Sequence, residues 1–380
     1  KDKFRKVREY LGVELSKKEL AEKEAEADPK IRSKAGLAKK IKIGERQHYK
    51  QSGAGLAITI GLPMYTITKP KETEEGLTIL YKGDMIYSTP DLQFLHYFIA
   101  EDLIPTANEI FRRMEENPNW MKKRISDFKT AVSGLEDLGE ELIQSAVDFD
   151  KEKTLKIYEK FLKRDYNYWI TSVFIDLFDA LEDQVLNFIF RDKVKFIDKE
   201  DMQFLLLPNR SVFWKEKDDF DKIRTFMKKN KLKKTDKKLW EKLKEHSKKY
   251  WWMSNDYQTV RKLGASDFML KLDENSENPF WKTSALKKKE LIKKYALSED
   301  TIKRLEQFAE MAYLRDIRKQ YTQIANYAMI TFYHTVSKKI GIPEEWSNFV
   351  VPFSEYKQFL EKDKKLLKEL ELRTKTGVWV

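Results

Sequence analysis

The order of apolar and polar positions along the chain changes twice. Residues 1–50 are polar and of mixed charge, with little apolar periodicity. Residues 51–90 contain short β-branched and aromatic runs, whereas from about Asp91 onward apolar residues recur every three or four positions, the spacing of one helix face. We therefore predict a polar helical arm at 1–50, a small β-rich subdomain at 51–90 and a helical domain at 91–372.

Two long helices stand out in the third stretch. In residues 151–190, apolar residues at spacings of four or multiples of four form one stripe, which predicts a core helix. The second helix has clear ends, because Ser298 suits an N-cap and Gly341 suits a C-terminal stop. A final helix at 354–372 leads into residues 373–380, which we interpret as an exit strand toward a downstream unit. The apolar stripe of the first long helix, at 151–190, consists of Ile157, Phe161, Trp169, Val173, Leu177 and Leu181.

Four short runs between residues 51 and 90 predict strands. They lie at 56–60, 64–68, 77–81 and 85–87, and Gly83 within residues 82–84 would provide a turn that joins the last two as a hairpin. The sequence thus predicts an α+β chain that is mainly α with a small β element. We expect a helical domain built on long helices, plus a short antiparallel sheet near the N-terminus.

The composition excludes several classes of protein. With 41% hydrophobic and 13% aromatic residues, the chain of 380 residues has enough apolar material for packed cores. The absence of cysteine excludes disulfides, a thiolate nucleophile and Cys-ligated metal sites, and it fits a reducing compartment. No apolar run is long and uncharged enough to predict a membrane span. We therefore expect a cytoplasmic protein.

The residue types that usually carry chemistry are scattered. The glycine-rich stretch at 52–55 lacks the lysine of a phosphate-binding loop, and paired carboxylates lie in charged helical stretches. The histidines form no His-x-x-x-His pair, so a zinc site has no support. The sequence assigns no catalytic residue, no metal ligand and no cofactor to this chain. The four histidines are His48, His96, His246 and His334.

Positive charge is concentrated in one stretch. The formal net charge is +12, and residues 228–249 contain eleven lysines and three acidic residues, a local excess of +8. A solvated helix face is the commoner explanation of such a run. The alternative is a phosphate-facing surface for nucleic acid. This alternative surface consists of Lys228, Lys229, Lys231, Lys233, Lys234, Lys248 and Lys249.

An aromatic group follows directly after these lysines. Aromatic rings beside cations can stack on a planar ligand or a base, as Trp251, Trp252 and Tyr257 would in a nucleic-acid complex. The same residues can instead pack two helices together. Both explanations stay open at this point. The group comprises His246, Tyr250, Trp251, Trp252, Asn255, Asp256 and Tyr257.

Four stretches, in this order along the chain, carry a family resemblance. They are residues 205–213 with the acidic residues that follow, 246–257, 314–319 and 372–379. Together they resemble four segments of phosphoenolpyruvate-utilising enzymes. In the same order, these are the leucine-Pro-Ser segment, the His-x-x-x-Tyr-x-Trp-x-x-Asn-x-Tyr stretch, the Arg-x-x-Arg helix and the exit toward a mobile domain. That group includes phosphoenolpyruvate synthase-like and rifampicin phosphotransferase-like proteins, and the resemblance is to its helical middle region, over roughly residues 76–380.

The resemblance implies a region that works together with other domains. Neither the group's phosphohistidine motif nor its ATP-grasp domain has a counterpart here, so the implied role is a substrate-side or spacer region that is non-catalytic by itself. Its implied partners are a mobile phosphohistidine domain, downstream or in trans, and an anionic small molecule. The alternative function is that of a basic helical nucleic-acid-binding or scaffold protein. The expected ligand-binding residues are His246, Tyr250, Trp252, Asn255, Tyr257, Arg315 and Arg318.

Overall fold

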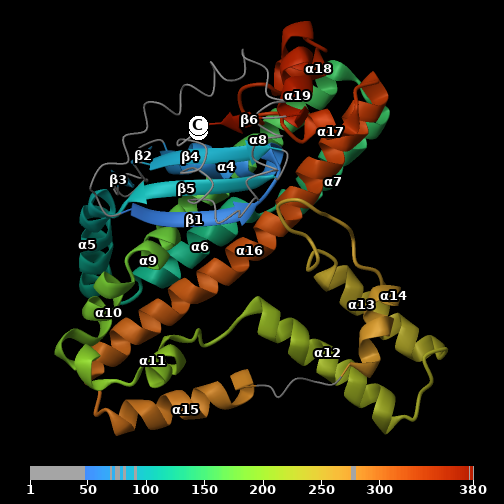
Figure 1. The fold of residues 1–380 in the computed structure, drawn as a ribbon. Coiled ribbons are helices and arrows are strands. Elements are labelled where there is room, and N and C mark those ends of the chain that lie inside the picture. The colour runs from blue at the N-terminus through green and yellow to red at the C-terminus, as the bar shows by residue number, and fades with distance from the viewer. Residues whose placement is uncertain are drawn as a thin grey trace, which may run out of the picture.

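The computed structural model describes most of the chain after the first 47 residues. The described residues are 48–68, 71–72, 78–79, 83–89, 92–274, 280–375 and 377–379. Apart from its last three residues, which belong to a strand, the expected helical arm at 1–50 lies outside them. Helices make up most of the described chain, and a small sheet lies against one side of them (Figure 1).

The long helix α16, Glu299–Ile340, runs through the whole molecule and has helices on both sides (Figure 1). Its 42 residues correspond to about 63 Å at 1.5 Å per residue. Both predicted ends are confirmed. The side chain of Ser298 accepts a hydrogen bond from the Thr301 amide at 3.3 Å, and Gly341 ends the helix in a left-handed conformation with φ of 69°.

On one side of α16, the helices of residues 100–190 build the main core against both halves of the long helix. The predicted apolar stripe is buried as expected, but the predicted single helix at 151–190 is divided, because the chain tightens at a 3-10 turn and then breaks at Leu181. The helices of this side are α5 Ala100–Glu116, α6 Trp120–Val132, α7 Leu135–Asp148 and α8 Lys151–Ser172, followed by the turn η2 Val173–Ile175, α9 Asp176–Ala180 and α10 Glu182–Phe190.

A second group of helices lies on the other side of α16. In Figure 1, α11, α12 and α15 lie below the long helix, and α13 and α14 lie at the right, where α13 packs beside α12. A separate apolar cluster joins α12, α13 and α14, and Ile324 connects it to α16. The elements are η3 Arg191–Phe196, α11 Lys199–Leu206, α12 Val212–Lys229, α13 Lys237–Tyr250, α14 Ala265–Leu270, η4 Lys271–Asp273 and α15 Phe280–Lys294.

The predicted fold class is wrong in its short N-terminal sheet. The runs at 56–60 and 64–68, which were expected to be strands, form the helix α4, Ala57–Thr68. Leu56, Ile58 and Ile60 are buried where α4 meets α8 and α16. The β-branched residues misled the prediction, because burial against two helices outweighs an intrinsic strand preference of at most about 1 kcal/mol per residue.

The strands of the described chain come from other segments. One antiparallel sheet has the order β1-β5-β4-β6 and consists of β1 His48–Ala54, β5 Gln93–Ile99, β4 Gly83–Thr89 and β6 Gly377–Trp379. The predicted hairpin turn is also wrong, because Gly83 begins β4, whose neighbours in the sheet are β5 and β6. The short strands β2 Lys71–Glu72 and β3 Thr78–Ile79 pair separately.

The C-terminal segment returns to this sheet. The predicted helix at 354–372 is divided into α18, Tyr356–Leu360, and α19, Lys364–Lys375, which follow the short helix α17, Glu344–Ser347. Within the segment 373–380, which was expected as an exit strand, residues 373–375 belong to α19, whereas β6, Gly377–Trp379, pairs with β4, so that Trp379 lies opposite Tyr87. Segments from both ends of the described chain therefore share one sheet. No helix of the described residues is long and apolar enough to cross a membrane.

The closest contact between α7 and α16 generates a first prediction. A Cβ atom added at Gly139 would lie 3.0 Å from the Cβ of Ala328 and 3.6 Å from a ring carbon of Phe161. A Gly139→Val variant should therefore lose about 1–3 kcal/mol of unfolding free energy through overpacking. Urea unfolding measures the loss. Glu141→Val, on the exposed face of the same helix, is the matched control and should change stability by less than about 0.5 kcal/mol.

Candidate anion-binding pocket

The seven expected ligand-binding residues do not surround one cleft. His246, Tyr250 and Trp252 belong to the apolar cluster of α12, α13 and α14. There, His246 Nε2 lies 3.0 Å from Glu216 Oε1, and the Tyr250 hydroxyl donates to Asp219 at 2.8 Å. Trp252 is 1% exposed. These side chains hold α13 against α12 and present no open face to a ligand.

The remaining expected residues lie on or against α16. Arg318 is buried, pairs with Asp176 of α9 at 3.0 Å and lies over the ring of Trp169, with 5.1 Å to the ring centre. Asn255 is also buried and donates to the backbone oxygen of Gln323 at 3.4 Å. Arg315, one turn before Arg318, is partly buried. Arg318 therefore attaches α8 and α9 to the long helix, and Asn255 attaches the segment after α13 to it.

Tyr257 and Arg318 do lie near one another, beside a buried carboxyl group. The guanidinium of Arg318 acts on Tyr257 electrostatically, and burial raises the pKa of Tyr257 to about 12. Asp165 of α8 is buried, and its Oδ1 has no hydrogen-bond partner among the residues that the structure describes. Burial raises the pKa of Asp165 from 3.8 to about 7, against the lowering effect of a hydrogen bond from Tyr168. This polar cluster is enclosed by helices on the inside of the fold.

The alternative lysine surface is only partly available. All seven lysines are exposed. Two of them also pair with acidic side chains, since Lys249 lies 2.8 Å from Asp219 and Lys234 pairs with Asp273.

The indoles that were expected to stack on bases are in the core. Trp251 is 8% exposed, its ring centre lies 5.0 Å from that of Tyr327, and its indole nitrogen donates to Glu136 at 2.7 Å. Trp252 is equally enclosed, as described above. A base bound at the exposed lysines therefore could not stack on the ring of Trp251 or Trp252.

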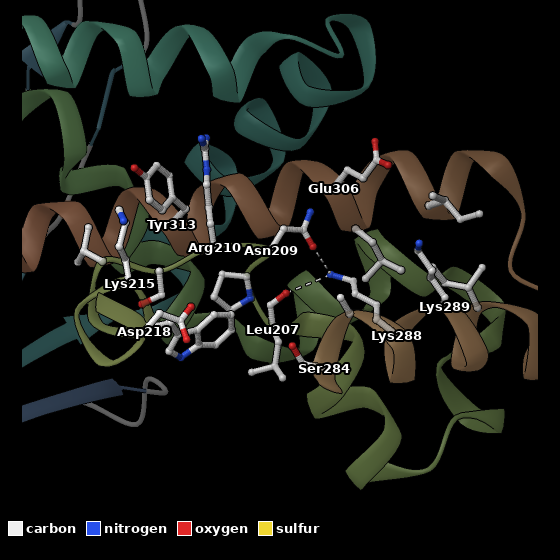
Figure 2. A pocket seen from close by; sticks show the side chains of 18 of the residues that line it. Leu207, Asn209, Arg210, Lys215, Asp218, Ser284, Lys288, Lys289, Glu306 and Tyr313 are labelled. Atoms are coloured by element: carbon white, nitrogen blue, oxygen red, sulfur yellow. Dashed lines mark hydrogen bonds between the residues drawn. The ribbon is translucent and has the colours of Figure 1, made fainter. Parts of the chain in front are cut away.

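The sequence reasoning missed a pocket of about 700 Å³ on the other side of α16. The pocket, which we call the anion pocket, lies between the connection from α11 to α12, the first turns of α12, α15 and one face of α16. Figure 2 shows side chains from these elements around it. Its α16 wall follows helical spacing and consists of Ile302, Leu305, Glu306 and Tyr313.

Local sequence explains the shape of the connection that forms one wall. A residue before proline disfavours helical backbone, so Leu207, which precedes Pro208, is extended and α11 ends at Leu206. Four residues later, Ser211 caps α12 by accepting a hydrogen bond from the amide of Phe213 at 3.2 Å. The short segment between the two helices therefore turns its polar groups toward α15.

Cations outnumber carboxylates among the residues that line the anion pocket. Three of the five cations have acidic partners, since Arg210 pairs with Glu310 at 2.6 Å, and Lys215 and Lys222 with Asp219. Lys288 and Lys289 form no ion pair within the part of the chain that the structure describes. The lining cations are Arg210, Lys215, Lys222, Lys288 and Lys289, and the lining carboxylates are Asp218 and Glu306.

Lys288 donates hydrogen bonds to two residues of the pocket wall. Figure 2 shows its amine directed toward the connection between α11 and α12. There it donates to the backbone oxygen of Leu207 at 3.1 Å and to Asn209 Oδ1 at 3.4 Å. Burial lowers the pKa of Lys288 from 10.5 to about 8, and the charge of Glu306 opposes this effect. An anionic ligand in the pocket would favour the charged amine and gain a charge-assisted hydrogen bond from it.

The sequence contained only a weak signal for this pocket. Residues 207–211 carry part of the family resemblance, which assigns no ligand to them. The lysines of α15 have the pattern of an ordinary charged helix face. Asn209 and Lys288 lie 79 positions apart. Only the packing of α15 against the connection brings them together.

Comparisons with protein families, with curated proteins and with solved structures gave no match. Among the described residues, no group of three or more His, Asp or Glu side chains is arranged to hold a metal ion.

The buried carboxyl of Asp165 generates a prediction about pH. Its folded-state pKa of about 7 lies above the ordinary value of 3.8, so the folded state binds the proton more tightly, and the stability that this proton contributes at low pH is lost as pH rises from about 4 to about 7. Relative to an Asp165→Asn variant, the parent should lose about 2–3 kcal/mol of unfolding free energy between pH 5 and pH 8. Urea unfolding at both pH values tests this. Asp137→Asn, which removes an exposed carboxylate of α7, measures the general effect of the charge change.

The Arg318–Asp176 pair generates a prediction about stability. An Arg318→Ala variant leaves Asp176 partly buried without its partner and should lose about 3–5 kcal/mol of unfolding free energy. The melting temperature should therefore fall sharply, whereas Lys319→Ala at the neighbouring exposed position should leave it nearly unchanged. An Arg318→Ala protein that melts like the parent but loses affinity for phosphoenolpyruvate would place the ligand at Arg318 instead.

Proposed function

We propose that this chain is the ligand-binding helical region of a protein related to phosphoenolpyruvate-utilising phosphotransferases, and that it binds an anionic small molecule in the anion pocket. The observation that carries the proposal is the pair of lysines at the pocket, Lys288 and Lys289, which have no carboxylate partner in the described part of the chain. A bound anion would supply the missing negative charge.

The size and chemistry of the anion pocket support a small molecule. Its volume of about 700 Å³ lies within the range of about 300–1,000 Å³ that is usual for ligand sites. Apolar and aromatic groups such as Trp214, Ile292 and Tyr313 form much of the lining, and the guanidinium of Arg210 lies 4.0 Å from the Tyr313 ring centre. A ligand would thus find an apolar wall beside a cationic one, which suits an acidic group on a small organic body.

The position of the anion pocket also supports the family relation. One wall is the segment around Leu207, Pro208 and Ser211, which resembles the leucine-Pro-Ser segment of phosphoenolpyruvate-utilising enzymes. Asp218, which follows it in the resemblance, lines the pocket too. In this proposal the chain holds its ligand for a mobile phosphohistidine domain, which acts from downstream or in trans, and the chain performs no phosphate transfer by itself.

Substitution of Lys288 tests the proposed function. A Lys288→Met variant keeps the length of the side chain but loses its charge and its hydrogen-bond donors. Loss of one charge-assisted contact of about 1.5–3 kcal/mol should weaken the binding of phosphoenolpyruvate about ten- to hundredfold. Isothermal titration calorimetry with phosphoenolpyruvate and with inorganic phosphate measures the change.

The matched control is Lys293→Met, an exposed lysine of the same helix that does not line the pocket. It should bind as the parent does. If neither anion binds the parent, or if both variants bind like the parent, the anion pocket is not the ligand site. Because exposed charges are screened by salt more than enclosed ones, the affinity of the parent should also depend only moderately on ionic strength.

A further inference from the structure

The surroundings of Lys288 differ from those of an ordinary surface lysine. In the described part of the chain, its amine donates to two uncharged oxygens, of Leu207 and Asn209, and to no carboxylate. The side chain is partly buried against the connection between α11 and α12. An ammonium group in such a place loses hydration, and this favours the neutral amine more strongly than the charge of Glu306 favours the ammonium.

The neutral amine is the form that reacts as a nucleophile. With a pKa of about 8, roughly half of the Lys288 amines are neutral at pH 8, against less than about 1% for a lysine with the ordinary value near 10.4. Lysines activated by burial or by neighbouring cations are those that form imines with carbonyl compounds. Burial is the feature that acts on Lys288, and the cations Lys289 and Arg210 line the same pocket.

We propose that Lys288 is a reactive amine that forms an imine with a small aldehyde or ketone carrying a phosphate or carboxylate group. This inference rests on the proposed function, since it names the class of ligand that the anion pocket takes. The exposed Lys289, which forms no ion pair with any described residue, would hold the acidic group, and the carbonyl carbon would lie at the Lys288 amine, whose position Figure 2 shows.

The step balances without any further reactant. The lone pair of the neutral Lys288 nitrogen attacks the carbonyl carbon, a carbon–nitrogen bond forms and the carbonyl oxygen takes up a proton. A proton leaves the nitrogen, and the resulting carbinolamine then loses water to give the imine. Neither oxidation nor reduction takes place, and water is the only other product.

The pocket geometry favours selectivity for carbonyl compounds with an acidic group. The apolar side chains of Trp214 and Ile292 and the ring of Tyr313 provide an apolar wall for the organic body of such a compound. The two oxygens that accept from Lys288 fix the direction of its amine before a ligand enters. A carbonyl compound without an acidic group would gain nothing from Lys289 and should react more slowly.

Trapping with sodium borohydride tests the proposal. The protein is incubated at pH 8 with pyridoxal 5′-phosphate, which carries an aldehyde and a phosphate, and the imine is reduced to a stable secondary amine. Peptide mass spectrometry should find the adduct on Lys288 at a level at least tenfold above that on Lys293. Pyridoxal, which lacks the phosphate, should label Lys288 at least tenfold less.

Two variants and a binding measurement decide the result. Lys288→Arg keeps the positive charge but cannot form the imine and should lose the main adduct, whereas Lys293→Arg should keep it. Labelling spread over the lysines in proportion to their exposure, or unchanged in Lys288→Arg, overturns the proposal. If phosphoenolpyruvate binds in calorimetry but no adduct forms at Lys288, only the imine proposal fails. If neither occurs, the proposed function fails with it.

Discussion

The burial of α16 is the constraint on which the rest of the structure depends. Its buried residues point in several directions around the helix and not along a single stripe, as expected for a helix that must be covered on more than one side. On one side, the hydroxyl groups of Tyr333 and Tyr158 lie 2.8 Å apart in the main core, and Ala328 faces Gly139. On the other side, Leu305 and Tyr313 form a wall of the anion pocket. The pocket therefore has one rigid wall that belongs to the central helix.

Buried polar groups fix how the segment after α13 lies on this helix. Asn326 of α16 donates to the backbone oxygen of Asp256 at 3.0 Å, and Asn255 Oδ1 accepts from the amide of Arg261 at 2.7 Å. Thr59 of α4 donates to the backbone oxygen of Tyr257 at 2.6 Å. Such bonds are directional, so they select one arrangement of the segment where apolar contacts alone would tolerate several. Asn255 and Tyr257 were expected to bind a ligand, but here their polar groups bind other parts of the same chain. The sequence alone does not distinguish these two uses.

The parts of the fold that the sequence predicted are those that local interactions determine. The ends of α16 depend on Ser298 and Gly341, each of which acts within a few residues of itself. The helix α4 was missed because its burial against α8 and α16 depends on residues far away in the sequence. The pairing of Tyr87 with Trp379 and the contact of Asn209 with Lys288 also join residues that are far apart in the sequence. No periodicity within a segment records such contacts, so the sheet order and the anion pocket could not be predicted from one sequence.

Two cations that are withdrawn from water, Arg318 and Lys288, have different kinds of partner. Arg318 is buried with Asp176 at 3.0 Å and with the ring of Trp169, so its charge is neutralised inside the protein. Lys288 is also withdrawn from water, but its partners are uncharged oxygens, and its pKa falls accordingly to about 8. Burying a cation without a counter-ion costs stability. A fold that needed Lys288 only for packing would lose nothing by an apolar residue there. The cost is offset if an anion enters the pocket, or if the neutral amine is itself the form that is used. Both proposals for this pocket follow from that asymmetry between Arg318 and Lys288.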